Sequence, residues 1–176
     1  MLPDRFETAR LILRPIAPED APAIFAGYAQ DPEVVRFVTW RAHRTLADTE
    51  AFIARCLAML PDDGRNYVLT RRTDAALLGD FGLLRPRPHR LYCGYVLARP
   101  HWGQGLMSEA LLAIADWAMA SPEIWRIDAV CDVENHASAR VMEKAGMQRE
   151  GILRRWLVNP NLSAEPRDCF SYARVR

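Results

Sequence analysis

The sequence predicts a mixed α/β fold, an α+β arrangement in which helices flank a mixed sheet. Strand-like and helix-like segments follow one another in the order β–α–α–β–β–β–α–β–α–β–β. Residues 91–145 contain a strand–helix–strand–helix unit, and the right-handed crossover of such units places their two strands parallel and adjacent. The 176 residues, 50% apolar and 26% charged, suffice to bury one core, so we expect a single domain over residues 1–176.

The first third of the chain predicts a strand followed by helical segments. Residues 10–14 form a short β-like run that a proline closes. Pro18 followed by two acids is typical of a helix start, and Asp31-Pro32-Glu33 repeats this signal for a short helix that ends near Phe37. Thr45-Leu46-Ala47-Asp48 resembles a capping box. The apolar residues behind it recur at helical spacing and predict an amphipathic helix: Ile53, Cys56, Leu57 and Leu60.

The rest of the chain predicts a meander, then the strand–helix–strand–helix unit, then two closing strands. A basic turn at residues 85–90 separates the second and third strands of the meander. Asn135 precedes the last helix as a candidate N-cap, and Gly146 ends that helix as a C-terminal cap. The expected strands are 67–70, 77–84, 91–98, 125–131, 148–158 and 168–175, and the expected helices are 106–119 and 135–145.

The segment from Arg99 to Ala110 joins an apolar strand to a helix through two glycines, Gly103 and Gly105. Glycines at such a junction leave a row of backbone N–H groups uncovered at the positive end of a helix, which suits a phosphate group. A Walker loop needs Gly-Lys-Ser/Thr, but Leu106 follows the second glycine. A Rossmann loop needs a third glycine where Ser108 stands. The sequence therefore predicts a phosphate site of another kind.

Charge and composition narrow the class of partner. The 23 basic and 22 acidic residues give a net charge of +1, which argues against nucleic acid or an anionic membrane as a partner. No apolar run approaches the roughly 20 residues of a membrane span, and the N-terminus lacks the apolar core of a signal peptide. None of the four cysteines lies in a Cys-x-x-Cys pair, so we expect no metal site. These features predict a cytoplasmic protein.

Two further segments, which follow the glycine loop in the sequence, complete a pattern typical of one protein family. Asp132-Val133-Glu134-Asn135-His136-Ala137-Ser138 follows the next predicted strand, and Glu143-Lys144-Ala145-Gly146-Met147 ends the helix after it. Together with the glycine loop and residues 7–15, they resemble the GNAT superfamily of acyl-coenzyme A N-acyltransferases, most closely its RimJ/RimL-type ribosomal-protein N-acetyltransferase branch. The resemblance covers nearly the whole chain. It implies the GNAT fold, with about seven strands in a mixed sheet, helices on both faces, and two central parallel strands that splay apart.

The resemblance also implies acetyl-coenzyme A as the cosubstrate. Main-chain groups of the splayed strand would pair with the pantetheine arm, and the amides of the glycine loop would hold the diphosphate. Asn135 is either an ordinary N-cap or also a partner of the coenzyme arm, and Lys144 is either a phosphate ligand or a cation at a helix C-terminus. The implied cofactor residues are Val96, Leu97, Ala98, Trp102, Gly103, Gln104, Gly105, Leu106, Met107, Asn135 and Lys144.

The reaction that the resemblance implies is direct attack of a primary amine on the thioester, with both substrates bound. In many members a tyrosine serves the leaving thiolate, but Met142 occupies that position here. Ser138, one turn earlier, is the available hydroxyl, unless it is only a first-turn helix serine. The position of a frequent glutamate is held by Tyr92, which is a poor base at neutral pH because a tyrosine pKa lies near 10, although it could order water. Ser138 and Tyr92 are the candidate catalytic residues, and the base is not identified.

The acceptor is expected to meet residues 36–44, where Trp40 and Arg41 are candidate wall residues. The branch resemblance favours the N-terminal α-amine of a protein or peptide as the acceptor. A small-molecule amine, such as an amino acid, a polyamine or an antibiotic, is an alternative. A non-catalytic coenzyme A sensor is a further alternative, prompted by Tyr92 and Met142 at positions where many members carry catalytic groups. The habit of the family suggests a homodimer.

Overall fold

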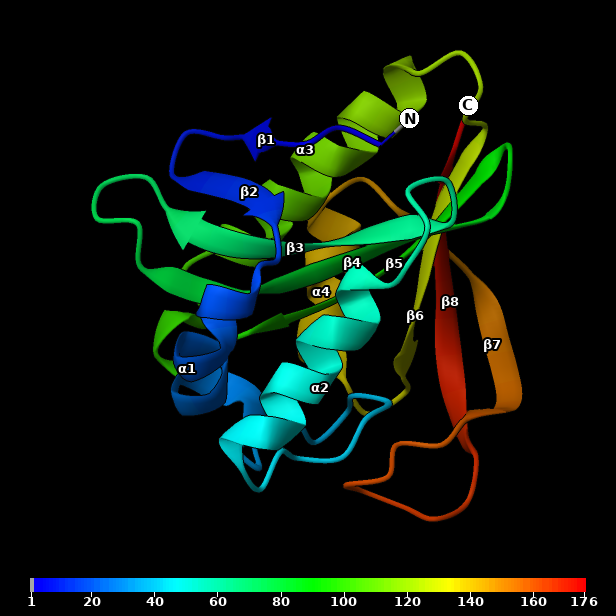
Figure 1. Cartoon of the computed structure of the whole chain (residues 1–176). Coiled ribbons are helices and arrows are strands. Elements are labelled where there is room, and N and C mark those ends of the chain that lie inside the picture. Colours follow the sequence, from blue (N-terminus) through cyan, green and yellow to red (C-terminus); the bar gives the residue numbers. More distant parts are fainter. Residues whose placement is uncertain (1) are drawn as a thin grey trace.

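The computed structural model describes residues 2–176, so Met1, which the predicted domain includes, lies outside it. Its strands form one mixed sheet in the order β1-β2-β3-β4-β5-β6-β8-β7 (Figure 1). The strands are β1 (Phe6–Glu7), β2 (Leu11–Pro15), β3 (Gly64–Arg71), β4 (Leu77–Arg87), β5 (Arg90–Leu97), β6 (Arg126–Asp132), β7 (Gln148–Leu157) and β8 (Arg167–Val175). The α-helices are α1 (Ala21–Ile24), α2 (Leu46–Leu57), α3 (Leu106–Ala120) and α4 (His136–Lys144).

The predicted mixed α/β fold is confirmed, with eight strands in the described sheet where the sequence indicated about seven. The additional strand is β1, which pairs with β2 only at Phe6↔Leu13 and Glu7↔Ile12. Each described pair of neighbouring strands is antiparallel except β5 and β6. That parallel pair is the one that the crossover through α3 requires, because a chain returning to the same end of the sheet needs a long connection.

Helices cover both faces of the sheet: Figure 1 shows α1 and α2 in front of it and α3 and α4 behind. On β5, Cys93 and Tyr95 pack in the core beneath α3 and α4, whereas Val96 packs in a second core beneath α1 and α2. Because side chains alternate along a strand, Tyr92 and Gly94 share the side of Val96. We call this side of the sheet the α1/α2 face.

Local signals in the sequence set two helix ends as predicted. Thr45 Oγ1 accepts from the Asp48 N–H at 3.3 Å, and Asp48 Oδ2 accepts from the Thr45 N–H at 2.9 Å, so the capping box begins α2. Gly146, at φ +79°, follows α4, and the Met147 N–H bonds to the Met142 carbonyl at 3.0 Å. The predicted start of α2 and the predicted glycine cap of α4 are therefore confirmed.

The predicted helix at residues 31–37 is wrong, because this segment is a series of turns. A first turn closes, since the Val35 N–H bonds to the Asp31 carbonyl at 3.0 Å, but the helix does not continue. Asn161, in the loop between β7 and β8, donates to the carbonyls of Val35 at 2.7 Å and Trp40 at 2.8 Å. These long-range bonds fasten the segment to the loop between β7 and β8.

The described helices are mostly short. The helix predicted at Pro18 starts as a 3-10 turn (Pro18–Asp20), continues as α1 and ends in π-helical turns (Phe25–Ala29). The longest helix, α3, has 15 residues. Within residues 2–176, no helix combines the length and the apolar character needed to cross a membrane.

Candidate active site

The loop between β5 and α3 is open above its two glycines. Gly103 and Gly105 have φ values of +75° and +73°, a left-handed conformation that favours glycine. A Cβ on Gly103 would meet no atom within 4 Å, and one on Gly105 would meet only Arg10 Nη2, at 3.8 Å. Over the residues that the structure describes, no protein group accepts from the backbone N–H groups of residues 103–108. These free donors at the N-terminus of α3 form a site suited to an anion.

Glu109, in the first turn of α3, ties this loop to the turn before β2. Its carboxylate accepts from Thr8 Oγ1 at 2.5 Å, from the Arg10 N–H at 2.9 Å and from Arg10 Nε at 2.6 Å. Arg10 Nη1 in turn donates to the Gln104 carbonyl at 3.0 Å. Burial acts to raise the pKa of Glu109, but the hydrogen bonds from Thr8 and Arg10 outweigh it and the pKa is lowered. A charged Glu109 therefore holds Gln104, the residue between the two glycines, through Arg10.

The two central parallel strands part beyond their first residues. β5 and β6 pair only from Arg90↔Arg126 to Tyr92↔Asp128. Further along, the Ala98 N–H bonds to the Leu78 carbonyl on β4 at 2.8 Å. Because N–H directions alternate along a strand, the N–H groups of Leu97 and Tyr95 point towards the gap between β5 and β6. The sheet thus contains a splayed pair with main-chain donors along one side of the opening.

Several groups at the end of β5 are already engaged within the protein. Trp102 Nε1 donates to the Leu97 carbonyl at 2.6 Å, while its ring stays 46% exposed. The carbonyl of Val96 faces β4, since a Cβ on Gly79 would lie only 2.2 Å from it. Of the main-chain groups predicted to meet a ligand here, the Leu97 carbonyl and the Ala98 N–H are used, and the Leu97 N–H remains a free donor beside the gap.

The first turn of α4 lies across the gap from β5. Asn135 Oδ1 accepts from the Ser138 N–H at 3.1 Å, which leaves the Asn135 amide NH₂ free of protein acceptors among residues 2–176. Ser138 Oγ lies 2.9 Å from Tyr95 Oη, so the hydroxyls bridge α4 and β5. Burial raises the pKa of Tyr95, which keeps this phenol protonated. Asn135 is confirmed as an N-cap, and its free amide leaves room for a second role.

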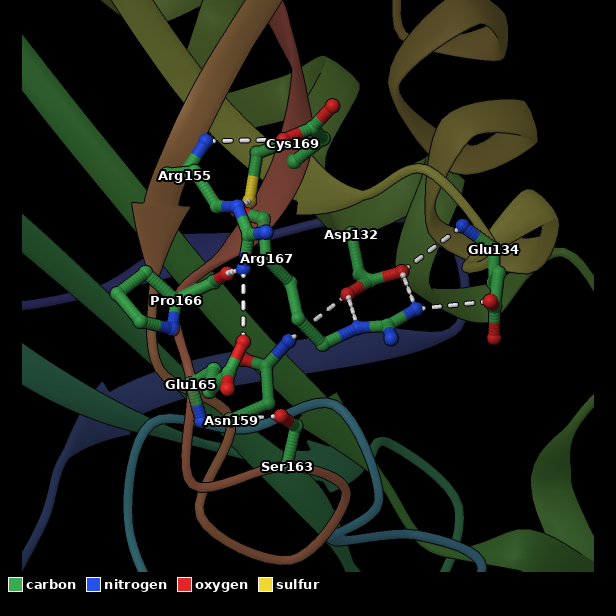
Figure 2. Close-up of polar contacts among 10 residues, drawn as sticks. Asp132, Glu134, Arg155, Asn159, Ser163, Glu165, Pro166, Arg167 and Cys169 are labelled. Atoms are coloured by element: carbon green, nitrogen blue, oxygen red, sulfur yellow. Dashed lines mark hydrogen bonds and ion pairs between the residues drawn. The ribbon is translucent and has the colours of Figure 1, made fainter.

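The turn that leads into α4 is held by a buried ion pair (Figure 2). Asp132 Oδ2 accepts from Arg167 Nε of β8 at 2.5 Å and from Asn159 Nδ2 at 3.1 Å. Its Oδ1 accepts from the Glu134 N–H at 2.9 Å, and Arg167 also pairs with the Glu134 carboxylate at 2.8 Å. Burial acts to raise the pKa of Asp132, but Arg167 and the Glu134 N–H outweigh it, so the pKa is lowered. The network joins β6, the start of α4 and the β7–β8 hairpin.

A hollow of about 370 Å³ opens on the α1/α2 face beside Tyr92. Burial raises the pKa of Tyr92 to about 12, so this phenol stays protonated at neutral pH. The hollow lies between the β4–β5 hairpin and the bulged end of β7. Its lining residues are Leu84, Pro86, Arg90, Tyr92, Trp156 and Leu157.

The two candidate wall residues before α2 differ in their surroundings. Trp40 is partly buried and lies 4.9 Å from the His43 ring and 6.1 Å from the Phe52 ring, between centroids. Arg41 is exposed. The Ala42 N–H donates to Asn161 Oδ1 at 3.1 Å, so the loop that carries both residues is fastened to the β7–β8 loop, which lies beside it in Figure 1.

Comparisons with known proteins identify this arrangement. The family model described as "Acetyltransferase (GNAT) domain" matches residues 10–148. The chain belongs to the GNAT acetyltransferase family. It is 32% identical over 154 residues to YoaA of Bacillus subtilis, an uncharacterized N-acetyltransferase, and the match covers 86% of each chain. The sequence-based prediction of an acetyl-coenzyme A-dependent N-acetyltransferase is thereby confirmed at the level of the family.

Solved structures of the acetyltransferase family share its fold. A GNAT acetyltransferase from Bacillus anthracis is 26% identical, with a TM-score of 0.84 and coverage of 97% of this chain and 98% of the other. RimL, a ribosomal L7/L12 α-N-protein acetyltransferase solved in complex with coenzyme A, is 21% identical, with a TM-score of 0.83 and coverage of 96% and 95%. The predicted resemblance to the RimJ/RimL-type branch is confirmed for the fold.

The acetyltransferase fold brings most of the sequence-predicted site residues to one region. The glycine loop, the open edge of β5 and the first turn of α4 surround the gap, and Tyr92 lies where the gap begins on the α1/α2 face. Lys144 is exposed at the far end of α4, about 13 Å along the helix from Asn135 at 1.5 Å per residue. Met142 is fully buried in the core beneath α3 and α4. Within residues 2–176 no group of three metal-ligating side chains occurs.

Sequence reasoning missed a buried pair on the α1/α2 face of the acetyltransferase. Tyr28 Oη donates to Asp80 Oδ2 at 2.6 Å, and both side chains are buried. The signal that could have found Asp80 is its place in Leu77-Leu78-Gly79-Asp80-Phe81, where a lone acid interrupts an apolar strand. Charged residues inside such runs are almost never buried without a partner or a function.

Proposed function

We propose that this enzyme transfers the acetyl group of acetyl-coenzyme A to the N-terminal α-amine of a peptide or protein. Family membership supports the reaction class, and the RimL structure, determined with coenzyme A, supports the ligand. The residues fit such a ligand: Gly103 to Met107 offer free N–H groups for a diphosphate, and Asn135 offers a free amide beside the gap. Bound acetyl-coenzyme A supplies a thioester carbonyl with a thiolate leaving group.

Ser138 is the residue we propose to stabilise the leaving thiolate. Its hydroxyl lies in the first turn of α4, beside the gap through which the thioester arm would run, and Tyr95 holds it at 2.9 Å. The protonated Tyr95 has one proton, which can be donated either to the Ser138 carbonyl at 3.2 Å or to Ser138 Oγ at 2.9 Å. In the second arrangement the serine proton is free for the sulfur. The Leu97 N–H, which points into the same gap, is the donor we propose for the developing oxyanion. We assign no role as a base to Tyr92, because its raised pKa keeps it protonated.

We expect Glu109→Gln to raise the dissociation constant for coenzyme A about 5- to 20-fold, because charged hydrogen bonds that hold the loop are worth roughly 1.5–3 kcal/mol and about 1–1.8 kcal/mol of this is expected to reach the ligand site. The turnover number at saturating acetyl-coenzyme A should change less than twofold, since Glu109 touches the loop and not the gap. Calorimetric titration and steady-state kinetics measure the two effects. Glu123→Gln is the matched control, because the Glu123 side chain is 69% exposed and pairs with Arg85, away from the glycine loop. An unchanged dissociation constant in Glu109→Gln would contradict the proposed role of Glu109 in holding the glycine loop.

The observation that carries the peptide acceptor is the hollow beside Tyr92. It is open to solvent and lined largely by apolar side chains, and one of its lining residues, Tyr92, is the last residue of β5 that pairs with β6 before the strands part. A peptide whose α-amine reaches the gap would lay its following residues along this hollow. An α-amine also has a pKa of about 7.7–8.0, against about 10.4 for lysine, so a weak base suffices to deprotonate it.

We expect Trp156→Ala to raise the KM for peptides about tenfold while the KM for acetyl-coenzyme A stays unchanged, because only the peptide loses an aromatic contact. Trp125→Ala is the matched control: both tryptophans are 55% exposed, and Trp125 lies outside the hollow. The assay is thiol release from acetyl-coenzyme A with tripeptides that begin with Met, Ala or Ser, compared with free amino acids and spermidine. If only the small amines were acetylated, the acceptor would be a small amine and the peptide acceptor would be rejected. Binding of coenzyme A without thiol release on any amine would instead favour a sensor.

A further inference from the structure

Asp80 differs from the other buried aspartates of the described chain in having no cation beside it. The others pair with arginine: Asp20 with Arg14, Asp128 with Arg90 and Arg126, and Asp132 with Arg167. Asp80 is 7% exposed, and its side-chain partner within residues 2–176 is Tyr28 Oη alone. A buried carboxylate without a cation is costly, so its presence here points to a use for the charge.

The place of Asp80 in the sheet is one strand away from the opening, because β5 lies between β4 and the gap. Asp80 lies on β4 directly across from Val96 of β5, and two residues further along the same face Gly82 pairs with Gly94. A Cβ on Gly94 would meet no atom within 4 Å, and Gly94 is exposed although it lies in a central strand. On this face the space above Gly94 is therefore open between Val96 and Tyr92, while Asn66 Nδ2 lies 3.5 Å from the Cβ position of Gly82.

One oxygen of Asp80 is free to contact a ligand. Oδ2 accepts from Tyr28, whereas no protein donor contacts Oδ1. In the part of the chain that the structure describes, every side-chain polar atom sealed from solvent has a hydrogen-bond partner. Because Oδ1 has no such partner, it must be accessible to solvent, and the small remaining exposure of Asp80 includes this atom. Tyr28 fixes the carboxylate, and its second oxygen faces accessible space.

We propose that Asp80 is the general base of the reaction and the anion that receives the ammonium group of the acceptor. The inference rests on the proposed acetyl transfer and names the base that the sequence left unidentified. Asp80 Oδ1 accepts one proton from the ammonium. The lone pair released on nitrogen forms the bond to the carbonyl carbon, and the C–S bond breaks with its electron pair going to sulfur. The nitrogen loses its second proton, and the thiolate takes up one, through Ser138 or water, so that one proton returns from Asp80 to solvent for each turnover.

The chemistry of the surroundings agrees with this role. Burial raises the pKa of Asp80 to about 6, and the hydrogen bond from Tyr28 opposes part of that rise. The titratable groups that face it do not compete near neutral pH: burial raises the pKa of Cys56 on α2 to about 12 and raises that of Tyr28 further. Asp20, on the 3-10 turn before α1, is paired with Arg14 of β2. A carboxylate with this pKa is ionised at pH 7 and is basic enough to take a proton from an α-ammonium group.

The test compares Asp80→Asn with two variants of its surroundings at saturating acetyl-coenzyme A and an alanine-led tripeptide. Asp80→Asn should lower the turnover number about 100-fold or more, while the dissociation constant for coenzyme A changes less than threefold. In the wild-type enzyme the rate should fall as pH drops through about 6, because Asp80 becomes protonated. Tyr28→Phe should shift the acidic limb of the pH–rate profile to higher pH, since it removes the hydrogen bond that lowers the pKa of Asp80. Asp20 is a buried aspartate on the same face. Asp20→Asn should leave the acidic limb of the pH–rate profile where it is, although it lowers the stability of the fold.

A second measurement does not depend on turnover. In protein labelled with ¹³C at aspartate carboxyls, the Asp80 signal, assigned by its absence from Asp80→Asn, should titrate near pH 6. Adding the tripeptide to the coenzyme A complex should lower that midpoint, because an ammonium neighbour favours the carboxylate. A midpoint that stays below 5 in the free enzyme, or one that the peptide does not move, would overturn the assignment even if no amine were acetylated. If Asp80→Asn kept turnover within threefold of an active wild type, acetyl transfer would stand and Asp80 would be rejected as its base.

Discussion

Gly103→Asp should abolish coenzyme A binding at concentrations that saturate the wild-type enzyme, with a dissociation constant raised at least 100-fold. The residue lies at φ +75° among N–H groups that have no protein acceptor, and a Cβ there would enter open space. A carboxylate placed in that space would stand against the diphosphate that the N–H groups are proposed to hold. Two like charges about 4 Å apart repel by about 4 kcal/mol at an effective dielectric of about 20, and salt reduces this value.

Gly103→Asn is the control that separates charge from backbone strain. Asparagine has nearly the shape of aspartate, and both residues tolerate the left-handed conformation better than other side chains do. The Asn variant should bind coenzyme A within about tenfold of wild type, and calorimetric titration at two salt concentrations measures the difference. Gly105 would give a less clear comparison, because Arg10 Nη2 lies 3.8 Å from its Cβ position and would neutralise an added acid. Equal binding by Gly103→Asp and Gly103→Asn would reject the loop as a diphosphate site.

The parts of the site that the sequence predicted depend on local signals. The glycine loop, the start of α3 and the cap at Asn135 are each encoded by a few neighbouring residues, because left-handed turns and helix caps are set by the residue types within them. The strand–helix–strand order predicted the parallel pair of β5 and β6 by the same reasoning. For these elements a pattern of a dozen residues contained the structural information.

The features that the sequence did not predict depend on contacts between distant residues. Tyr28 and Asp80 are 52 positions apart, and Arg10 and Glu109 are 99 apart. Asn161 binds the Val35 carbonyl, in the segment where the sequence predicted a helix, from 126 positions away. No local periodicity reports such partners, so the predicted helix was wrong and the buried aspartate was overlooked. A charged residue inside an apolar strand is the one local sign that such a contact exists.

Arg167→Ala should lower the free energy of unfolding by about 3 kcal/mol at pH 7, because it leaves the Asp132 carboxylate buried without a cation. The Asp132 side chain has no exposed surface, whereas Arg167 is 25% exposed, so water can replace the arginine only in part. Urea denaturation followed by circular dichroism measures the change. Arg154→Ala is the matched control from the same hairpin, since Arg154 is 83% exposed and pairs with Asp168 at 3.2 Å. The control should lose less than about 1 kcal/mol.

The pH dependence of this loss identifies its cause. The pKa of Asp132 is lowered in the folded protein, so the network stabilises the fold above the pKa of an unfolded aspartate, near 3.8, and that contribution fades as pH falls through the lowered folded value. Without Arg167, burial raises the pKa of Asp132 instead, and the carboxyl group is neutral in acid. The difference between wild type and Arg167→Ala should therefore be largest near pH 7 and shrink below about pH 4. A difference that stayed constant across this range would point to lost packing of the arginine side chain, because an apolar contact does not titrate. Since Asp132 also holds the Glu134 N–H at the entrance to α4, the same variant should weaken coenzyme A binding at pH 7.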